Sequence, residues 1–187
     1  MSRGRNLFVL ALLGLGVVPA VAQPVADPRA TDATQLFEAF CVRDLASRDR
    51  ALAVLGNGNQ MASRLPDDLV ATLQGGRTGG VAWAIAGPNQ SQLLLGYTGN
   101  GICEVRVADA DEAALKSAFA GMAKSSAQQA GAKLSSKPAS TRDQAGAKLT
   151  YQTYTYPYAG KTAHFAITTS DKRVGTEQHL MTFALAQ

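Results

Sequence analysis

Two cysteines, Cys41 and Cys103, constrain the fold of this chain more than any other residues. Apolar residues recur at helical spacing through TQLFEAFCVRDL (34–45), and Cys41 lies on that apolar stripe. Apolar and charged residues alternate through ICEVRV (102–107), so Cys103 shares a strand face with valines. Since both thiols point toward a core, the sequence predicts a disulfide that ties a helix to the inner face of a sheet.

The first 22 residues have the pattern of a secretory signal. Arg3 and Arg5 precede an apolar run over 7–18, and Ala20-Val21-Ala22 forms a small-x-small cleavage site. The run is shorter than the roughly 20 apolar residues that span a bilayer, and no later segment is longer, so we expect no membrane-spanning helix. We expect a periplasmic or secreted protein, in a compartment where a cysteine pair forms a disulfide.

Charge gives little indication of an acidic partner. The chain has 18 Lys and Arg against 14 Asp and Glu, a net charge of +4, and the signal removes two arginines and no acid, which leaves +2. The basic residues are scattered and accompany no recognition motif, so nucleic acid is a poor candidate partner. Residues 23–187 are long enough for a single domain with its own core.

The periodicities predict an α+β fold with N-terminal helices and two three-stranded antiparallel meanders separated by a helix. Helical patterns cover 34–45, 47–55 and, as a short turn, 65–73. Alternating or apolar runs predict strands over 81–86, 92–98, 102–107, 148–156, 161–169 and 177–186. The intervening helix has Asp109 as its expected N-cap, Glu112 three positions later as the second half of a capping box, and Gly131 as its stop.

Two segments between these elements are expected to be loops. Residues 131–146 contain few large apolar residues and are predicted to form a mobile loop or an edge hairpin. The segment GGRTGG (75–80) is glycine-rich, as phosphate-binding loops are, but it precedes a strand and lacks the Lys-Ser/Thr of a P-loop. A flexible loop is the favoured interpretation.

Four of the five tyrosines fall within YQTYTYPY (151–158). If Leu149 and Tyr151 face inward together with Phe165, strand alternation places a set of aromatic, basic and polar residues on the opposite, solvent-facing side. That candidate binding surface consists of Lys148, Gln152, Tyr154, Tyr156, Thr162 and His164. It would suit an envelope glycan, a peptide or an anionic polymer, although tyrosine is also common on half-buried strand faces for structural reasons.

No residue pattern predicts a catalytic, metal or cofactor site. The two histidines should lie on opposite faces, with His164 outward and His179 toward the core, so we do not expect them to share a metal ion. No Gly-x-Ser-x-Gly elbow is present. Acidic residues cluster only at expected helix starts, where they complement the helix dipole; these are Asp67, Asp68, Asp109, Asp111 and Glu112.

The stretches FCVRDLASRDRALAVL, the following LP, and GICEV resemble a group of small exported proteobacterial proteins that have no assigned activity. Those proteins often carry Gly-Trp after the second helix, where this chain has GNGNQMA. The resemblance implies a periplasmic location and a disulfide, and it implies no catalytic residues.

Two functions are therefore compared. The first is a non-enzymatic binding or interaction protein of the cell envelope. The alternative is a small carboxylate-dependent hydrolase that would use Glu38, Glu104 or Glu177, and a cleft with two carboxylates less than roughly 10 Å apart would favour it.

Overall fold

One antiparallel sheet organises the chain in the computed structural model, which describes residues 26–56 and 60–186. The predicted signal peptide, residues 1–22, lies outside the described residues. The strand order is β1-β2-β3-β4-β9-β8-β7-β5, and β6 also pairs with β7. The strands are β1 (Ala62–Arg64), β2 (Val81–Ala86), β3 (Gln92–Tyr97), β4 (Cys103–Val107), β5 (Ser135–Ser136), β6 (Ser140–Gln144), β7 (Ala147–Tyr158), β8 (Lys161–Ser170) and β9 (His179–Ala186).

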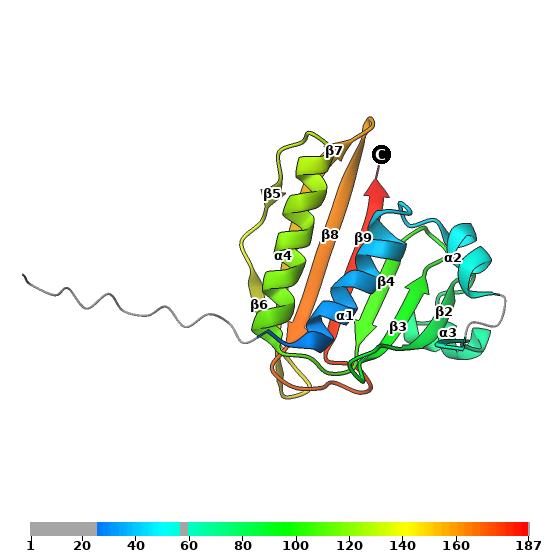
Figure 1. Cartoon of the computed structure of the whole chain (residues 1–187). Coiled ribbons are helices and arrows are strands. Elements are labelled where there is room, and N and C mark those ends of the chain that lie inside the picture. The colour runs from blue at the N-terminus through cyan, green and yellow to red at the C-terminus, as the bar shows by residue number, and fades with distance from the viewer. Residues whose placement is uncertain (1–25, 57–59, 187) are drawn as a thin grey trace, which may run out of the picture.

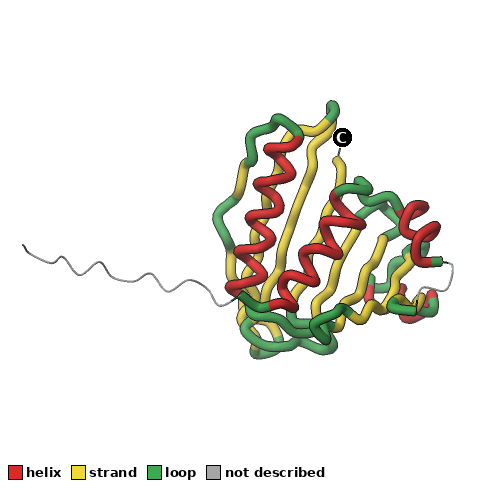
Figure 2. The backbone as a smooth tube through the Cα atoms, viewed as in Figure 1, coloured by secondary structure: helices red, strands yellow, loops and turns green. Residues whose placement is uncertain are grey.

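Helices α1 and α4 lie next to each other across one face of this sheet (Figures 1 and 2). The helices are α1 (Pro28–Phe37), which continues into a π-helical turn η1 (Glu38–Val42), α2 (Arg48–Leu55), α3 (Asp67–Leu73) and α4 (Glu112–Gln129). Together with the antiparallel sheet they confirm the α+β class. No helix among the described residues is long and apolar enough to cross a membrane.

The core lies between the sheet and the two helices. Alternation in β8 and β9 turns Phe165 and Phe183 toward the helices, and their rings lie 4.9 Å apart. The apolar stripe of α4 supplies Phe119, which contacts Phe37 of α1 at 5.5 Å and Phe165 at 6.4 Å. Each ring is at most 1% exposed, so burial of these aromatic side chains fixes both helices on the sheet.

The predicted disulfide is confirmed. Cys41 in η1 and Cys103 in β4 are bonded with their Cα atoms 5.4 Å apart, and both residues are fully buried. As the two apolar patterns predict, the bond joins the first helical segment to the helix-covered face of the sheet.

Helix α1 begins at Pro28, six residues before the predicted start. The Asp27 side chain caps it by accepting from the backbone N–H of Arg29 at 2.9 Å, and proline suits the first helical position. Asp32 is buried and accepts hydrogen bonds from Asn89 and Ser91 in the β2–β3 turn. These bonds position α1 along the sheet.

The N-cap predicted for α4 was wrong by two residues. Asp111, not Asp109, caps the helix by accepting from the backbone N–H of Ala114 at 2.7 Å. Asp109 forms an ion pair with Arg29 instead, which holds it outside the helix. Glu112 is therefore the first helical residue and accepts from the Thr169 hydroxyl at 2.7 Å instead of closing a capping box. Gly131 follows the helix with φ of 63°, as expected of a residue that stops a helix.

The two predicted meanders are not separate. β4 pairs with β9 over five residues, from Cys103 opposite Phe183 to Val107 opposite His179, so both meanders form one continuous sheet. The segment 131–146, predicted as a mobile loop or an edge hairpin, contains β5 and β6, and β6 forms a hairpin with β7.

His179 lies in the core, as predicted, at 1% exposure. The Ser170 backbone N–H donates to its Nδ1 at 3.3 Å, so its Nε2 carries the proton and donates to the Ala110 carbonyl at 3.0 Å. Burial lowers the pKa of His179 below its usual 6.5, although Glu112 and the Ala110 carbonyl oppose that shift.

This depressed pKa predicts a loss of stability in mild acid. The unfolded chain binds a proton on His179 as the pH falls through about 6.5, whereas the folded protein does so only at lower pH. We expect the urea midpoint to fall between pH 7.5 and 5.5, and His179→Gln, which stays neutral, to remove this decrease. Both proteins keep the exposed His164, so a difference between their pH profiles reports on His179. An equal decrease in both would show that another group titrates.

Candidate functional site: an apolar groove on the open face of the sheet

The tyrosine-rich strand β7 does not form the predicted binding surface, because the side chains predicted to face solvent face the helices and those predicted to face the core face outward. Tyr156 lies opposite Ala163 and Tyr154 opposite Phe165, so both tyrosines point toward α4. Tyr156 is only 5% exposed, and its hydroxyl is 2.9 Å from the Ser126 hydroxyl on that helix. Tyr151, predicted to be core, is instead 48% exposed on the other face.

The six residues of that predicted surface are divided between the two faces. Lys148, Gln152, Tyr154 and Tyr156 lie on the helix-covered face of β7, and Thr162 and His164 lie on the opposite face of β8. The error came from Leu149, whose side chain lies on the outer face next to its cross-strand neighbour Arg142 of β6, and is buried there and not in the main core. Because Leu149 was expected to face the core, the alternation along β7 was predicted correctly but each side chain was assigned to the opposite face.

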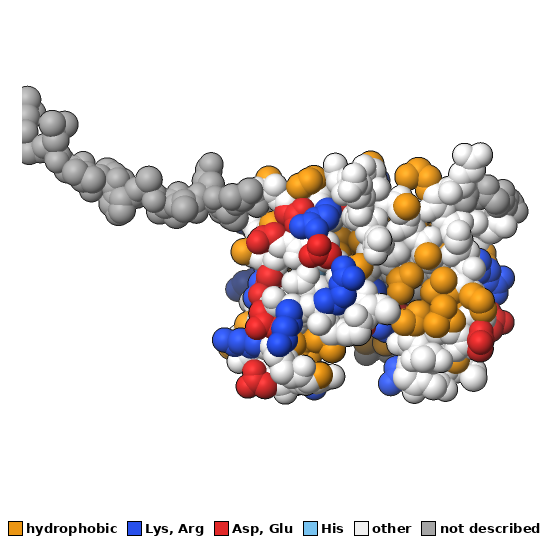
Figure 3. All heavy atoms as spheres, turned by 90° about the horizontal axis from the view of Figure 1, so that it is seen from below, with side chains coloured by type: hydrophobic (Ala, Val, Ile, Leu, Met, Phe, Trp, Pro, Cys, Tyr) orange, Lys and Arg blue, Asp and Glu red, His pale blue; other side chains and the backbone are white. Residues whose placement is uncertain are grey.

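A hollow of about 530 Å³ lies on the sheet face opposite α1 and α4. Its floor is the outward side of β2, β3 and β4, where Ala84, Leu94 and Arg106 are neighbours. Small side chains on β2 leave the space open, because Ala84 and Ala86 fill little of it. Leu69 and Leu73 of α3 form one wall, and Figure 3 shows hydrophobic side chains gathered on this side of the molecule.

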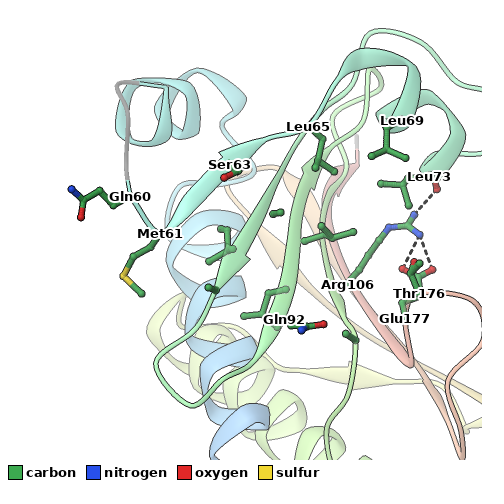
Figure 4. Close-up of a pocket in the computed structure, with 16 residues that line it drawn as sticks. Gln60, Met61, Ser63, Leu65, Leu69, Leu73, Gln92, Arg106, Thr176 and Glu177 are labelled. Carbon is green, nitrogen blue, oxygen red and sulfur yellow. Dashed lines mark hydrogen bonds and ion pairs between the residues drawn. The ribbon is translucent and has the colours of Figure 1, made fainter.

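The groove runs from Gln60 and Met61 at one end to Arg106, Thr176 and Glu177 at the other (Figure 4). We refer to it as the α3 groove. Leu69 is 43% exposed and Met61 is 56% exposed, so its apolar lining is open to solvent.

A buried ionic network closes the far end of the α3 groove. The two Nη atoms of Arg106 and its Nε contact two carboxylates: Nη1 donates to both oxygens of Glu177 at 2.7 and 2.9 Å, and Nε donates to Glu104 at 3.2 Å. Nη2 donates to the Leu73 carbonyl at 2.9 Å, which fastens the end of α3 to the sheet. The Arg106 side chain is only 12% exposed.

Charge interactions stabilise the ion pairs of Arg106 with Glu104 and Glu177. Burial opposes the charge on Arg106, but Glu104 and Glu177 outweigh it and raise the pKa of the guanidinium. Because the contacts use every nitrogen of Arg106, the far end of the groove offers no free cation to a ligand. The lining of the α3 groove is therefore suited mainly to apolar contact.

Strand β1 forms the outer edge of the sheet beside the near end of the groove. The Leu65 backbone N–H donates to Ala82, and the Met61 carbonyl accepts from Ala86, so Ser63 lies in the next hydrogen-bonded position, opposite Ala84. In an antiparallel pair the intervening residues direct their backbone groups away from the partner. Ala62 and Arg64 therefore present backbone donors and acceptors at the edge that have no partner in the part of the chain that the structure describes.

A second apolar hollow, of about 330 Å³, lies on the helix-covered face of this same edge. Its lining includes Leu36 and Phe40 from the first helical segment and Val54 from α2. It shares Met61, Ile85, Ala86 and Leu93 with the α3 groove. The β1 edge thus has apolar space on both of its faces.

Metal chemistry has no support in residues 26–56 and 60–186, where no three His, Cys, Asp or Glu side chains are grouped to hold an ion. His164 is exposed and His179 buried on opposite faces, as predicted.

Comparison with known proteins adds no assignment, since no protein-family model, curated protein or solved structure matches the chain.

Sequence patterns did not reveal the α3 groove. β1 has only three residues, too few for an alternation to be recognised, although α3 lies within the short helical turn predicted over 65–73. One feature of the sequence does point to this face of the sheet. In ICEVRV, alternation places Glu104 and Arg106 together on the face opposite Cys103.

Proposed function

We propose that this protein is an exported, non-enzymatic binding protein of the cell envelope, and that it binds an extended peptide with apolar side chains at the β1 edge and the α3 groove. The observation that carries the proposal is the combination of unpaired backbone groups on β1 with an open apolar groove beside them. The signal-like N-terminus, the disulfide and the resemblance to small exported proteins support a periplasmic location.

A peptide fits this site better than the other envelope ligands. Glycans and anionic polymers need free polar or cationic groups, whereas Arg106 in the α3 groove is already paired. An added strand would hydrogen-bond to the backbone of Ala62 and Arg64. Its alternate side chains would then enter the two hollows on opposite faces of the edge.

The carboxylate-dependent hydrolase has weaker support. Glu104 and Glu177 do converge, but the Arg106 guanidinium contacts both and occupies the space between them that a scissile bond would need. Glu38 lines a different hollow beside α4 and pairs with Arg43. No pair of free carboxylates among the described residues faces a cleft, so the binding function is preferred.

Leu69→Lys tests the proposed site. Random ten-residue peptides on phage would be selected against the chain lacking residues 1–22, and a selected peptide would be labelled with fluorescein for anisotropy titration. We expect Leu69→Lys to raise the dissociation constant about tenfold or more, because binding would desolvate the new charge against apolar side chains. The matched control is Leu45→Lys, since Leu45 is equally 43% exposed and lies outside the groove.

Strand addition is tested with the same peptide carrying N-methyl groups at alternate positions. Methylation on the edge-facing positions should abolish binding because it removes the donors that pair with β1, and methylation on the other set should be tolerated. Equal affinity of the two lysine variants, together with indifference to N-methylation, would rule out the proposed site.

A further inference from the structure

Another hollow, of about 270 Å³ and lined mainly by polar residues, lies on the other side of α3 and shares no lining residue with the α3 groove. Three arginines from three separate elements line it: Arg48 from α2, Arg64 from β1 and Arg77 from the loop before β2. Asp67 is the only acidic side chain among the described residues that line it, so these residues carry a net charge of +2. Like charges repel, and such a group is favourable only when an anion compensates it.

The protein itself compensates these arginines poorly. Arg64 contacts Asp67 at 3.5 Å, a long ion pair in which the Asp67 side chain is 82% exposed. Arg48 donates through Nη1 to the Gly79 carbonyl at 2.9 Å and keeps its remaining donors. Arg77 has no ion pair or hydrogen bond with any described residue.

Residues 77–80 of the glycine-rich segment 75–80 line one side of this hollow. Gly75, Gly76 and Gly79 have φ of 69°, 82° and 80°, a left-handed conformation that favours glycine and gives the chain its tight course between α3 and β2. The backbone N–H groups of residues 77–80 make no hydrogen bond to another described residue. Residues 77–80 therefore bring backbone N–H groups without a partner among the described residues to the hollow that the three arginines line.

We propose that this hollow is a binding site for a phosphate group. Three arginines from three elements line one hollow, and several guanidinium donors match a tetrahedral anion with many acceptor oxygens better than a carboxylate with two. The arrangement differs from a P-loop, because arginines brought from α2 and β1 replace the missing lysine and helix N-terminus. This site goes beyond the proposed peptide binding. Arg64 belongs to both, through its backbone in the β1 edge and its side chain in this hollow, whereas Arg77 belongs to the phosphate site and to no part of the peptide site.

Isothermal titration with inorganic phosphate at fixed ionic strength tests the site. We expect Arg77→Gln to weaken phosphate binding about tenfold or more, because it removes a charge-assisted contact. Arg77 is exposed and unpaired, so the variant should fold normally, which a thermal melt without phosphate would verify. The matched control is Arg142→Gln. Arg142 is also exposed but lies in β6, near the opposite end of the sheet, so its replacement should leave the phosphate affinity unchanged.

The phosphate could be free or carried by a lipid headgroup, and a second arm distinguishes these sources. Co-sedimentation would compare vesicles of phosphatidylcholine with vesicles that also contain phosphatidic acid, whose headgroup is a phosphomonoester. Binding in either arm that Arg77→Gln weakens and Arg142→Gln preserves would support the site and identify the source. The proposal is overturned if neither probe binds, or if both arginine variants weaken binding equally, which would indicate general charge attraction.

Discussion

Replacement of Arg106 by methionine is expected to lower the free energy of unfolding by about 3–5 kcal/mol, the range found when one partner of a buried ion pair is removed. The side chains of Arg106 and Glu104 are 12% and 9% exposed, so the lost guanidinium would leave Glu104 desolvated without its counter-charge. The Leu73 carbonyl would lose its donor as well. Urea denaturation at pH 7.5 measures the change.

A triple variant separates the cost of the unpaired carboxylates from the cost of lost packing. Arg106→Met combined with Glu104→Gln and Glu177→Gln removes all three charges and keeps side chains of similar size. We expect the triple variant to recover most of the stability lost in Arg106→Met. If it is as unstable as the single variant, Arg106 contributes through its contacts with α3 and not through charge pairing.

Local patterns predicted the elements well where burial is one-sided and the element is long. β2 spans 81–86, as predicted, and β3 and β4 end or begin within one residue of their predicted bounds. In these strands alternation decides which residues the helices cover, so sequence and tertiary structure agree. The same agreement placed Cys41 and Cys103 correctly.

Long-range pairing could not be derived in this way. β4 and β9 are neighbours in the sheet although more than seventy residues separate Cys103 from Phe183, and nothing in either segment specifies the other. This pairing turns two meanders into one sheet. It also brings Glu177, which directly precedes β9, to Arg106, so the ionic network of the α3 groove depends on a contact that local patterns do not encode.

The prediction of which face each side chain of β7 occupies was wrong for a related reason. A period of two identifies Tyr154 and Tyr156 as residues that share a face, but the choice between faces depends on what covers each. Leu149 faces outward and is buried beside Arg142 of the paired strand β6, and the polar residues of β6, STRDQ, show no alternation of apolar and polar residues. Packing of Tyr156 against Phe165, with ring centres 5.6 Å apart, determines the actual orientation.

Loss of the disulfide is the second large effect that we expect. The double variant Cys41→Ala/Cys103→Ala should lower the free energy of unfolding by about 4 kcal/mol, since the bond closes a long loop and so restricts the unfolded chain. The two residues are 62 positions apart. Urea denaturation of the variant, and of the original chain under reducing conditions, should give similar decreases.

Thiol labelling of the unfolded, unreduced protein provides the direct control and should detect no reactive cysteine. Two reactive thiols per chain, or an unchanged urea midpoint in the double variant, would contradict the assignment. Because Cys103 faces the helices and Arg106 faces the α3 groove on the same strand, the bond and the groove lie on opposite faces of β4. The double variant should therefore retain the peptide affinity of the α3 groove under conditions in which it remains folded, which would assign the disulfide to stability alone.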